Sequence, residues 1–121
     1  MAKTVLIVDD SASMRQLVEF TLKNAGYEVI AAVNGNDALS KSNGPKLDMV
    51  ITDLNMPEMD GITLIKHLRG TPANRFTPIV MLTTESQAGK QEEGKKAGAS
   101  GWIVKPFSPD KLLETITRLA K

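Results

Sequence analysis

The chain has 121 residues, of which 41% are hydrophobic and 24% are charged, and this composition fits one ordinary soluble domain with a single core. Its formal net charge of +1 gives no electrostatic reason to expect nucleic acid or an anionic membrane as a partner. The chain has no cysteine, which excludes disulfides, thiolate metal sites and thiol catalysis. The apolar stretch near the start is too short for a signal peptide or a membrane span, so we expect a cytoplasmic protein.

The first apolar run, residues 5–8, is rich in β-branched side chains and predicts a strand buried on both faces of a parallel sheet. It ends on two adjacent acids, Asp9 and Asp10. Either Asp10 or Ser11 can cap the helix that follows, and apolar residues then recur at helical spacing until Gly26 ends the helix.

The next elements alternate in the same way. We expect a second strand at 28–33 and a third at 47–53. Between them, residues 34–36 lead into a short helix around Ala38 and Leu39, which closes at residues 43–45. The third strand ends on Asp53, and Pro57 prevents the strand from continuing. A buried strand that carries an acid at its carboxyl end presents that acid in a crevice rather than in the core.

The second half of the chain continues the alternation of helices and strands. The expected order is a helix, a strand, a helix, a strand and a last helix, at 62–70, 78–83, 86–97, 101–104 and 108–119. Ser108 is the expected cap of the last helix, with Pro109 in its first position. The segment 86–97 has no large apolar side chain and two internal glycines, so its helix is predicted to be marginal.

Five strands that alternate with five helices predict an α/β fold: a parallel sheet wound by right-handed crossovers, with helices on both faces. We expect one domain over residues 1–121, with no linker or internal repeat. In such folds the loops that follow the carboxyl ends of the strands gather at one edge of the sheet. The polar residues at the strand ends should therefore converge: Asp9, Asp10, Asp53, Thr83 and Lys105.

Three clustered carboxylates repel one another unless a cation lies among them or some are protonated. All-oxygen ligands without histidine or cysteine suit Mg²⁺, which also binds substrate phosphates. Lys105 adds a positive charge, and Thr83 adds a hydroxyl that can stabilise charge on a phosphoryl oxygen. The set favours phosphoryl transfer with Asp53 as the nucleophile.

Simpler interpretations stay open for each residue taken alone. Asp9 and Asp10 can serve only as helix caps, Thr83 as a strand residue and Lys105 as a solvated surface residue. A lone Trp102 more often packs than switches, and His67 is expected to be an exposed helix residue without a role. A flavin site is disfavoured, because acids after the first strand would repel the cofactor phosphate.

Four motifs occur in order along the chain: Asp9-Asp10, Thr-Asp-Leu-Asn-Met-Pro around Asp53, Leu-Thr-Thr at 82–84 and Lys105-Pro106-Phe107. With these motifs the chain resembles the receiver domains of two-component response regulators, nearest to the single-domain chemotaxis type. The resemblance implies a flavodoxin-like three-layer fold with strand order 2-1-3-4-5. A hydrolase of the haloacid dehalogenase type is a weaker match, because it has a second acid where this chain has Asn55.

The resemblance also implies roles for single residues. Asp53 would accept a phosphoryl group from a CheA-type histidine kinase, and Asp9, Asp10, Asp53 and the backbone carbonyl of Asn55 would hold Mg²⁺. Thr83 and Lys105 would contact the phosphoryl oxygens, and the Asn55 side chain would influence the hydrolytic water. The Lys105–Pro106 bond would be cis, as is typical of the family. Trp102 stands where the family has a switch aromatic, usually Tyr or Phe.

The implied mechanism is a switch rather than an enzyme, with Mg²⁺-dependent autophosphorylation and autodephosphorylation. Phosphorylation would draw Thr83 toward Asp53 and let Trp102 turn inward, which changes the surface of the fourth helix, fifth strand and fifth helix. We also predict that the segment 86–97 is partly frayed or shifted until phosphate or a partner orders it.

With no output domain, the signal would leave by protein contact. We expect a monomer that acts on a flagellar motor switch protein or a phosphatase, without nucleic acid or membrane. A phosphate sink, a phosphorelay carrier and a non-phosphorylated binding module remain alternatives, although the last usually lacks one of the five site positions.

Overall fold

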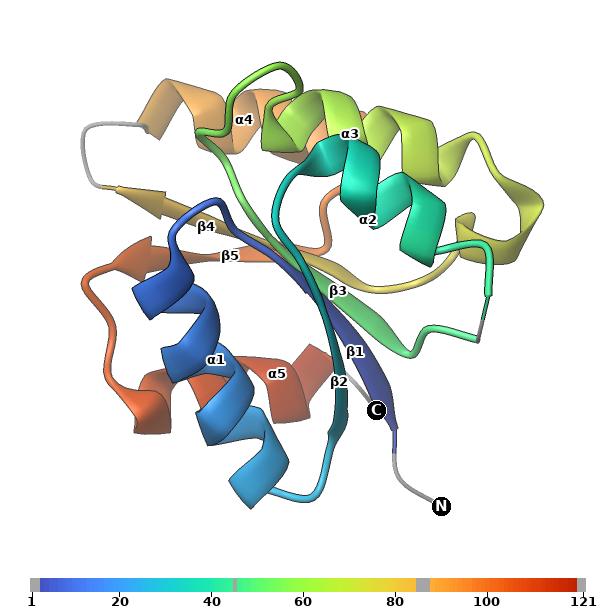
Figure 1. Ribbon diagram of the computed structural model, residues 1–121. Coiled ribbons are helices and arrows are strands. Elements are labelled where there is room, and N and C mark those ends of the chain that lie inside the picture. The colour runs from blue at the N-terminus through green and yellow to red at the C-terminus, as the bar shows by residue number, and fades with distance from the viewer. Residues whose placement is uncertain (1–2, 45, 85–87, 120–121) are drawn as a thin grey trace.

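A computed structural model describes residues 3–44, 46–84 and 88–119. The five strands form one parallel sheet in the order β2-β1-β3-β4-β5 (Figure 1). The strands are β1 Thr4–Val8, β2 Glu28–Ala32, β3 Met49–Asp53, β4 Ile79–Thr84 and β5 Gly101–Lys105. The helices are α1 Ala12–Asn24, α2 Gly35–Lys41, α3 Gly61–Arg69, α4 Ala88–Ala97 and α5 Pro109–Leu119, with a short 3₁₀ turn, η1, at Pro72–Asn74.

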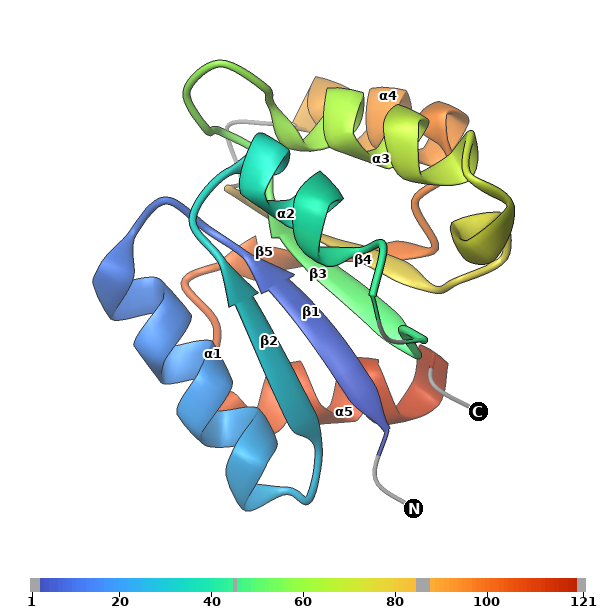
Figure 2. The ribbon, with the colours of Figure 1, turned by 45° about the vertical axis from the view of Figure 1, so that its right-hand side comes forward.

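The sheet is the middle layer of three. Helices α1 and α5 cover one face, and α2, α3 and α4 cover the other (Figure 2). This is the flavodoxin-like arrangement, and it confirms the predicted fold and strand order. Among the described residues, no helix is long and apolar enough to cross a membrane.

Alternate side chains of the central strands enter two separate cores. On β1, Val5 and Ile7 pack with α1 and α5, whereas Leu6 and Val8 pack with α2 and α3. All four are at most 2% exposed, which explains why this strand is a continuous apolar run in the sequence. The alternation fixes the register, because a shift by one residue would exchange the two faces.

The caps of α1 and α5 match the sequence, whereas α2 already begins at Gly35 and two strands are shorter than predicted. The Ser11 hydroxyl accepts a hydrogen bond from the Met14 N–H, and Ser108 caps α5 in the same way. The predicted strand at 28–33 ends at Ala32, because the Val33 N–H donates to the Asp37 side chain at the start of α2. The strand predicted at 47–53 begins at Met49, and η1 was not predicted.

Helix α4 is formed over Ala88–Ala97, and positions 86 and 87 of the predicted segment lie outside the described residues. Gly94 is buried against the Met81 side chain, and a Cβ at this position would collide with the Met81 Sδ and Cε atoms. Glycine therefore lets the helix backbone approach the sheet closely, in place of an apolar stripe. Whether phosphate orders this segment stays a prediction.

Arg69 joins two connections at the end of α3, the one between α3 and β4 and the one between α4 and β5. Its guanidinium donates hydrogen bonds of 2.7 Å to the carbonyls of Thr77 and Gly98, and one of 2.8 Å to the carbonyl of Asn74. Burial lowers the pKa of Arg69 from its ordinary value. The carbonyl contacts compensate the desolvation of the guanidinium and fasten the carboxyl end of α4 to α3.

Candidate functional site

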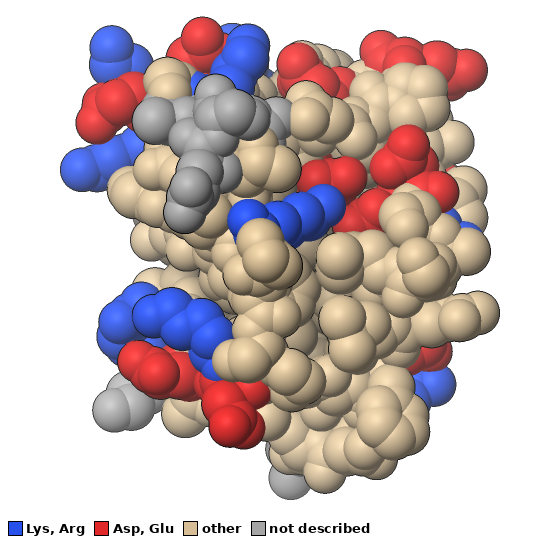
Figure 3. Space-filling view, turned by 90° about the vertical axis from the view of Figure 1, so that its left-hand side faces the viewer, with Lys and Arg blue, Asp and Glu red and all other residues tan. Residues whose placement is uncertain are grey.

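The ends of three strands place acids and a lysine at one edge of the sheet. Asp9 follows β1, Asp53 ends β3, and Lys105 ends β5. The register sets Val8 of β1 beside Thr52 of β3, so Asp9 and Asp53 reach the same level. Figure 3 views this edge, where basic atoms lie against a group of acidic side chains near the middle of the face.

The acids predicted to converge do so. One carboxylate oxygen each from Asp9, Asp10 and Asp53 lies within 4.8 Å of the others. The Lys105 Nζ atom donates a hydrogen bond of 3.0 Å to Asp53 Oδ1 and lies 3.8 Å from Asp9 Oδ2. The Leu54 N–H also donates to Asp53 Oδ1, at 2.8 Å. These two donors fix the orientation of the Asp53 carboxylate.

Asp9 is the carboxylate of the site whose ionised form is disfavoured by its surroundings. Burial raises the pKa of Asp9, and the charges of Asp53 and Asp10 act in the same direction, against the opposing effects of the Ser11 N–H and Lys105. The Asp9 Oδ1 atom accepts the Ser11 N–H at 2.9 Å. Its Oδ2 atom is buried without a hydrogen-bond partner in the described part of the chain. An oxygen of this kind in an all-carboxylate cluster fits a hard cation such as Mg²⁺.

The loop after β3 is held close to Asp53 by the start of α3. The Gly61 N–H donates to the Leu54 carbonyl at 2.9 Å, and a Cβ on Gly61 would collide with the Asp53 carbonyl oxygen. Glu58 has a positive φ of 69°, a conformation that few residues other than glycine adopt. The chain after the acid therefore turns back tightly, which leaves the Asp53 side chain at the rim of the sheet.

Of the other predicted site residues, Thr83 and Asn55 lie near the same edge, whereas Trp102 lies earlier on β5, beside Met81 of β4. Thr83 is fully buried near the end of β4, and Asn55 is exposed two residues after Asp53. Trp102 is 39% exposed on β5, and the Lys105–Pro106 peptide bond is cis. The cis bond agrees with the resemblance, whereas the roles of the residues stay predictions.

Two contacts at the site were not predicted from the sequence. The Arg15 Nη1 atom donates to the Asp9 carbonyl at 2.7 Å, and the Gln91 Nε2 atom donates to the Thr83 hydroxyl at 3.3 Å. A basic residue in the helix that follows an acid pair is a signal that could have identified Arg15. Gln91 gives no such signal, because a glutamine within a polar helix is ordinary.

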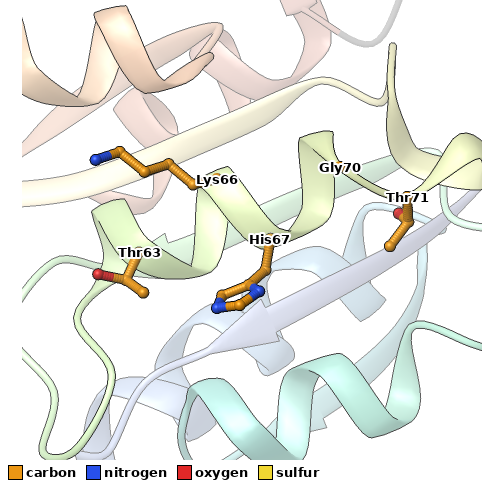
Figure 4. Close-up of a pocket in the computed structure, with 5 residues that line it drawn as sticks. All are labelled: Thr63, Lys66, His67, Gly70 and Thr71. Atoms are coloured by element: carbon orange, nitrogen blue, oxygen red, sulfur yellow. The ribbon is translucent and has the colours of Figure 1, made fainter.

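A shallow hollow on α3 lies outside this site. It is lined by Thr63, Lys66, His67, Gly70 and Thr71, all from one helix and its end (Figure 4). Lys66 and His67 point in different directions there and do not converge on a common point. His67 is exposed, as predicted.

Comparisons with known proteins agree with the geometry of the site. A family model described as the response regulator receiver domain matches residues 5–117. The chemotaxis protein CheY of Thermotoga maritima is 40% identical over 122 residues, with 100% of both chains covered. The structure of the Vibrio cholerae chemotaxis protein CheY4 is 49% identical, with a TM-score of 0.95 and coverage of 98% of this chain and 99% of that one.

A third relative is more distant. It is the receiver domain of a sensor histidine kinase from Pseudomonas aeruginosa, whose structure has a magnesium ion coordinated in the active site cleft. It is 25% identical, with a TM-score of 0.90 and coverage of 99% of this chain and 98% of that one. Because the family model spans most of the chain and full-length relatives match throughout, the chain belongs to the response regulator receiver domain family of two-component signalling proteins.

Proposed function

We propose that the chain is a phosphorylation-activated switch of the chemotaxis type, with Asp53 as the phosphoryl acceptor. The observation that carries this proposal is the hydrogen bond of 3.0 Å from Lys105 Nζ to Asp53 Oδ1, beside the carboxylates of Asp9 and Asp10. A lysine in this place can neutralise a phosphoryl oxygen once the acceptor is modified. The likeness to two chemotaxis proteins supports the biological setting.

Phosphoryl transfer would occur in line at one oxygen of Asp53. A carboxylate oxygen attacks the phosphorus of a phosphohistidine on the donor kinase, the phosphorus–nitrogen bond breaks, and the imidazole leaves with the electron pair. The Leu54 N–H and Lys105 hold the carboxylate in one orientation, which reduces the entropy lost on reaching the transition state. The Thr83 hydroxyl would contact a phosphoryl oxygen of the product.

Magnesium would be held by Asp9, Asp10, Asp53 and the backbone carbonyl of Asn55. The unpartnered Oδ2 atom of Asp9 and the three neighbouring carboxylate oxygens support this assignment. When bound, Mg²⁺ supplies positive charge against both the carboxylates and the phosphoryl oxygens. Asn55 is exposed at the rim, where its side chain can influence the water that hydrolyses the acyl phosphate.

The output would be a change of protein contact. We infer a cytoplasmic, monomeric protein that receives phosphate from a CheA-type histidine kinase and acts on a flagellar motor switch protein or a phosphatase. Thr83 and the exposed Trp102 would convey the change to the surface of α4, β5 and α5. A phosphate sink or a phosphorelay carrier would use the same site without a motor partner.

Incubation with acetyl phosphate and Mg²⁺, followed by intact-mass spectrometry, tests the chemistry. The wild type should gain one phosphoryl group, and Asp53→Asn should abolish the gain. Asp60→Asn is the matched control, because Asp60 is an exposed helix cap whose role asparagine can also fill. A wild-type protein that stays unmodified, or an adduct that persists in Asp53→Asn, would contradict the proposal.

A pull-down with and without beryllofluoride, a phosphoryl mimic, tests the partner. Capture of motor-switch protein only with the mimic supports the chemotaxis output. Capture of phosphotransfer domains or a histidine kinase alone would favour the sink or the relay carrier.

A further inference from the structure

The buried Thr83 hydroxyl has a specific partner on α4. Thr83 is 0% exposed, and its Oγ1 atom accepts a hydrogen bond of 3.3 Å from Gln91 Nε2. The side-chain hydrogen bonds and ion pairs of Asp53 go to Leu54 and Lys105, as far as the structure describes the chain. In the unphosphorylated form the Thr83 hydroxyl is therefore held by the helix and not by the acid.

Two paired contacts seat α4 on β4. Met81 and Thr83 are two residues apart on the strand and point to the same face of the sheet. Gln91 and Gly94 are three residues apart on the helix and therefore lie on one side of it. Met81 packs on Gly94, and Thr83 bonds Gln91. The first contact is apolar and the second is polar.

We propose that Gln91 is a positioning residue that restrains the Thr83 hydroxyl on the α4 side of the strand. The inference rests on the proposed function, in which Thr83 must reach a phosphoryl group on Asp53. For that, Thr83 Oγ1 leaves Gln91, and the polar contact that seats α4 is broken. Gln91 therefore opposes the phosphorylated state, and its loss links phosphorylation to the position of the helix.

The same contact predicts how α4 responds. Once Gln91 is released, the described contacts that still seat the helix include its close packing at Gly94, the contact of Ala97 with the core and the Arg69 hydrogen bonds to the Gly98 carbonyl just beyond its end. We expect the amides of α4 to lose protection from hydrogen exchange when the phosphoryl mimic binds. This sign is opposite to the gain of order that the sequence alone suggested for 86–97.

The decisive variant is Gln91→Met, which keeps length and helix propensity but cannot bond the hydroxyl. Beryllofluoride binding in the presence of Mg²⁺ is measured by fluorine NMR for the wild type, Gln91→Met, Thr83→Val and the double variant. Gln16→Met, at an exposed glutamine of α1, is the matched control. Gln91→Met should bind the mimic about 2- to 10-fold more tightly, which is the factor expected from one net hydrogen bond.

The double-variant comparison isolates the contact. In the Thr83→Val background, Gln91→Met should change the affinity by less than about 2-fold, because the hydroxyl is already absent. Equal affinities of Gln91→Met and wild type, weaker binding by Gln91→Met, or the same gain in the Thr83→Val background would each overturn the inference. Binding of the mimic by the wild type separates this failure from a failure of the proposed function, in which no binding occurs.

Hydrogen exchange of the wild type provides a readout that needs no variant. Loss of α4 protection with beryllofluoride supports the restraint by Gln91. Unchanged or greater protection would overturn it and would favour the ordering predicted from the sequence.

Discussion

Neutralising Asp9 should stabilise the metal-free protein. The Asp9→Asn side chain keeps an oxygen for the Ser11 N–H and replaces the unpartnered Oδ2 atom by an amide that can donate to Asp53. At an effective dielectric constant of about 20, two like charges 4.8 Å apart repel by about 3.5 kcal/mol. The attraction between Asp9 and the Lys105 ammonium, 3.8 Å away, is of similar size and offsets this repulsion.

The net gain therefore comes from relief of burial and from the screened repulsion of exposed Asp10, and we expect about 1–3 kcal/mol. For a chain of this size, each kcal/mol of added stability raises Tm by about 3–6 °C. Urea and thermal unfolding of the variant and the wild type in EDTA measure this difference in the free energy of unfolding. Added Mg²⁺ should stabilise the wild type and narrow the difference, because the variant lacks one carboxylate ligand.

The pH dependence has a definite sign. The pKa of Asp9 is raised above 3.8 in the folded state, so the folded protein binds this proton more tightly than the unfolded chain. The loss of folding stability caused by ionising Asp9 is absent below the pKa of Asp9 in the unfolded chain. It grows as the pH rises through the pKa of Asp9 in the folded protein. The advantage of Asp9→Asn should therefore vanish at low pH. A variant that is less stable than wild type in EDTA at neutral pH would refute the reasoning.

Two further predictions concern the packing of α4 and the hydrogen bonds of Arg69. Gly94→Ala should destabilise the protein by about 1–3 kcal/mol, because the new methyl group meets the Met81 side chain. Gly89 is exposed on the same helix, and a Cβ added there would meet no neighbouring part of the protein within 4 Å, so Gly89→Ala should stabilise the protein by about 0.5–1 kcal/mol. Both changes are read from urea midpoints, and equal effects would contradict the close approach of α4. Arg69→Met should cost about 2–4 kcal/mol, since the carbonyls of Asn74, Thr77 and Gly98 lose their donor. Lys66→Met, at an exposed position of the same helix, should stay within about 0.5 kcal/mol, and a similar loss for both would indicate that the Arg69 contacts carry no stability.

The site was predictable because each of its acids follows a recognisable apolar run. Asp9 and Asp53 end strands that are continuous in the sequence, and parallel strands bring such ends to one edge. The short caps of α1 and α5 were predictable for a related reason, since Ser11 and Ser108 act within three residues along the chain. Local chemistry and topology were sufficient in these cases.

Contacts between distant, ordinary residues were not predictable. The absence of an apolar stripe in α4 was evident, but the fit of Gly94 on Met81 depends on the spacing of two layers. The bond from Gln91 to Thr83 depends on the same spacing. The strand at 28–33 was predicted too long because Val33 is apolar, whereas its N–H bonds the Asp37 side chain.

The hydrogen bonds from Arg69 to the Gly98 carbonyl limit the kind of motion available to α4. The Gly98 carbonyl, just beyond the helix, accepts hydrogen bonds from both Nε and Nη2 of Arg69, at 3.0 Å and 2.7 Å. Gln91 lies seven residues before Gly98, or about 10 Å along the helix. A helix held at its carboxyl end can rotate about that end but cannot translate along its axis. Release of Gln91 would therefore swing the amino-terminal end of α4 in an arc about Gly98, and the displacement would be largest beside the phosphorylation site.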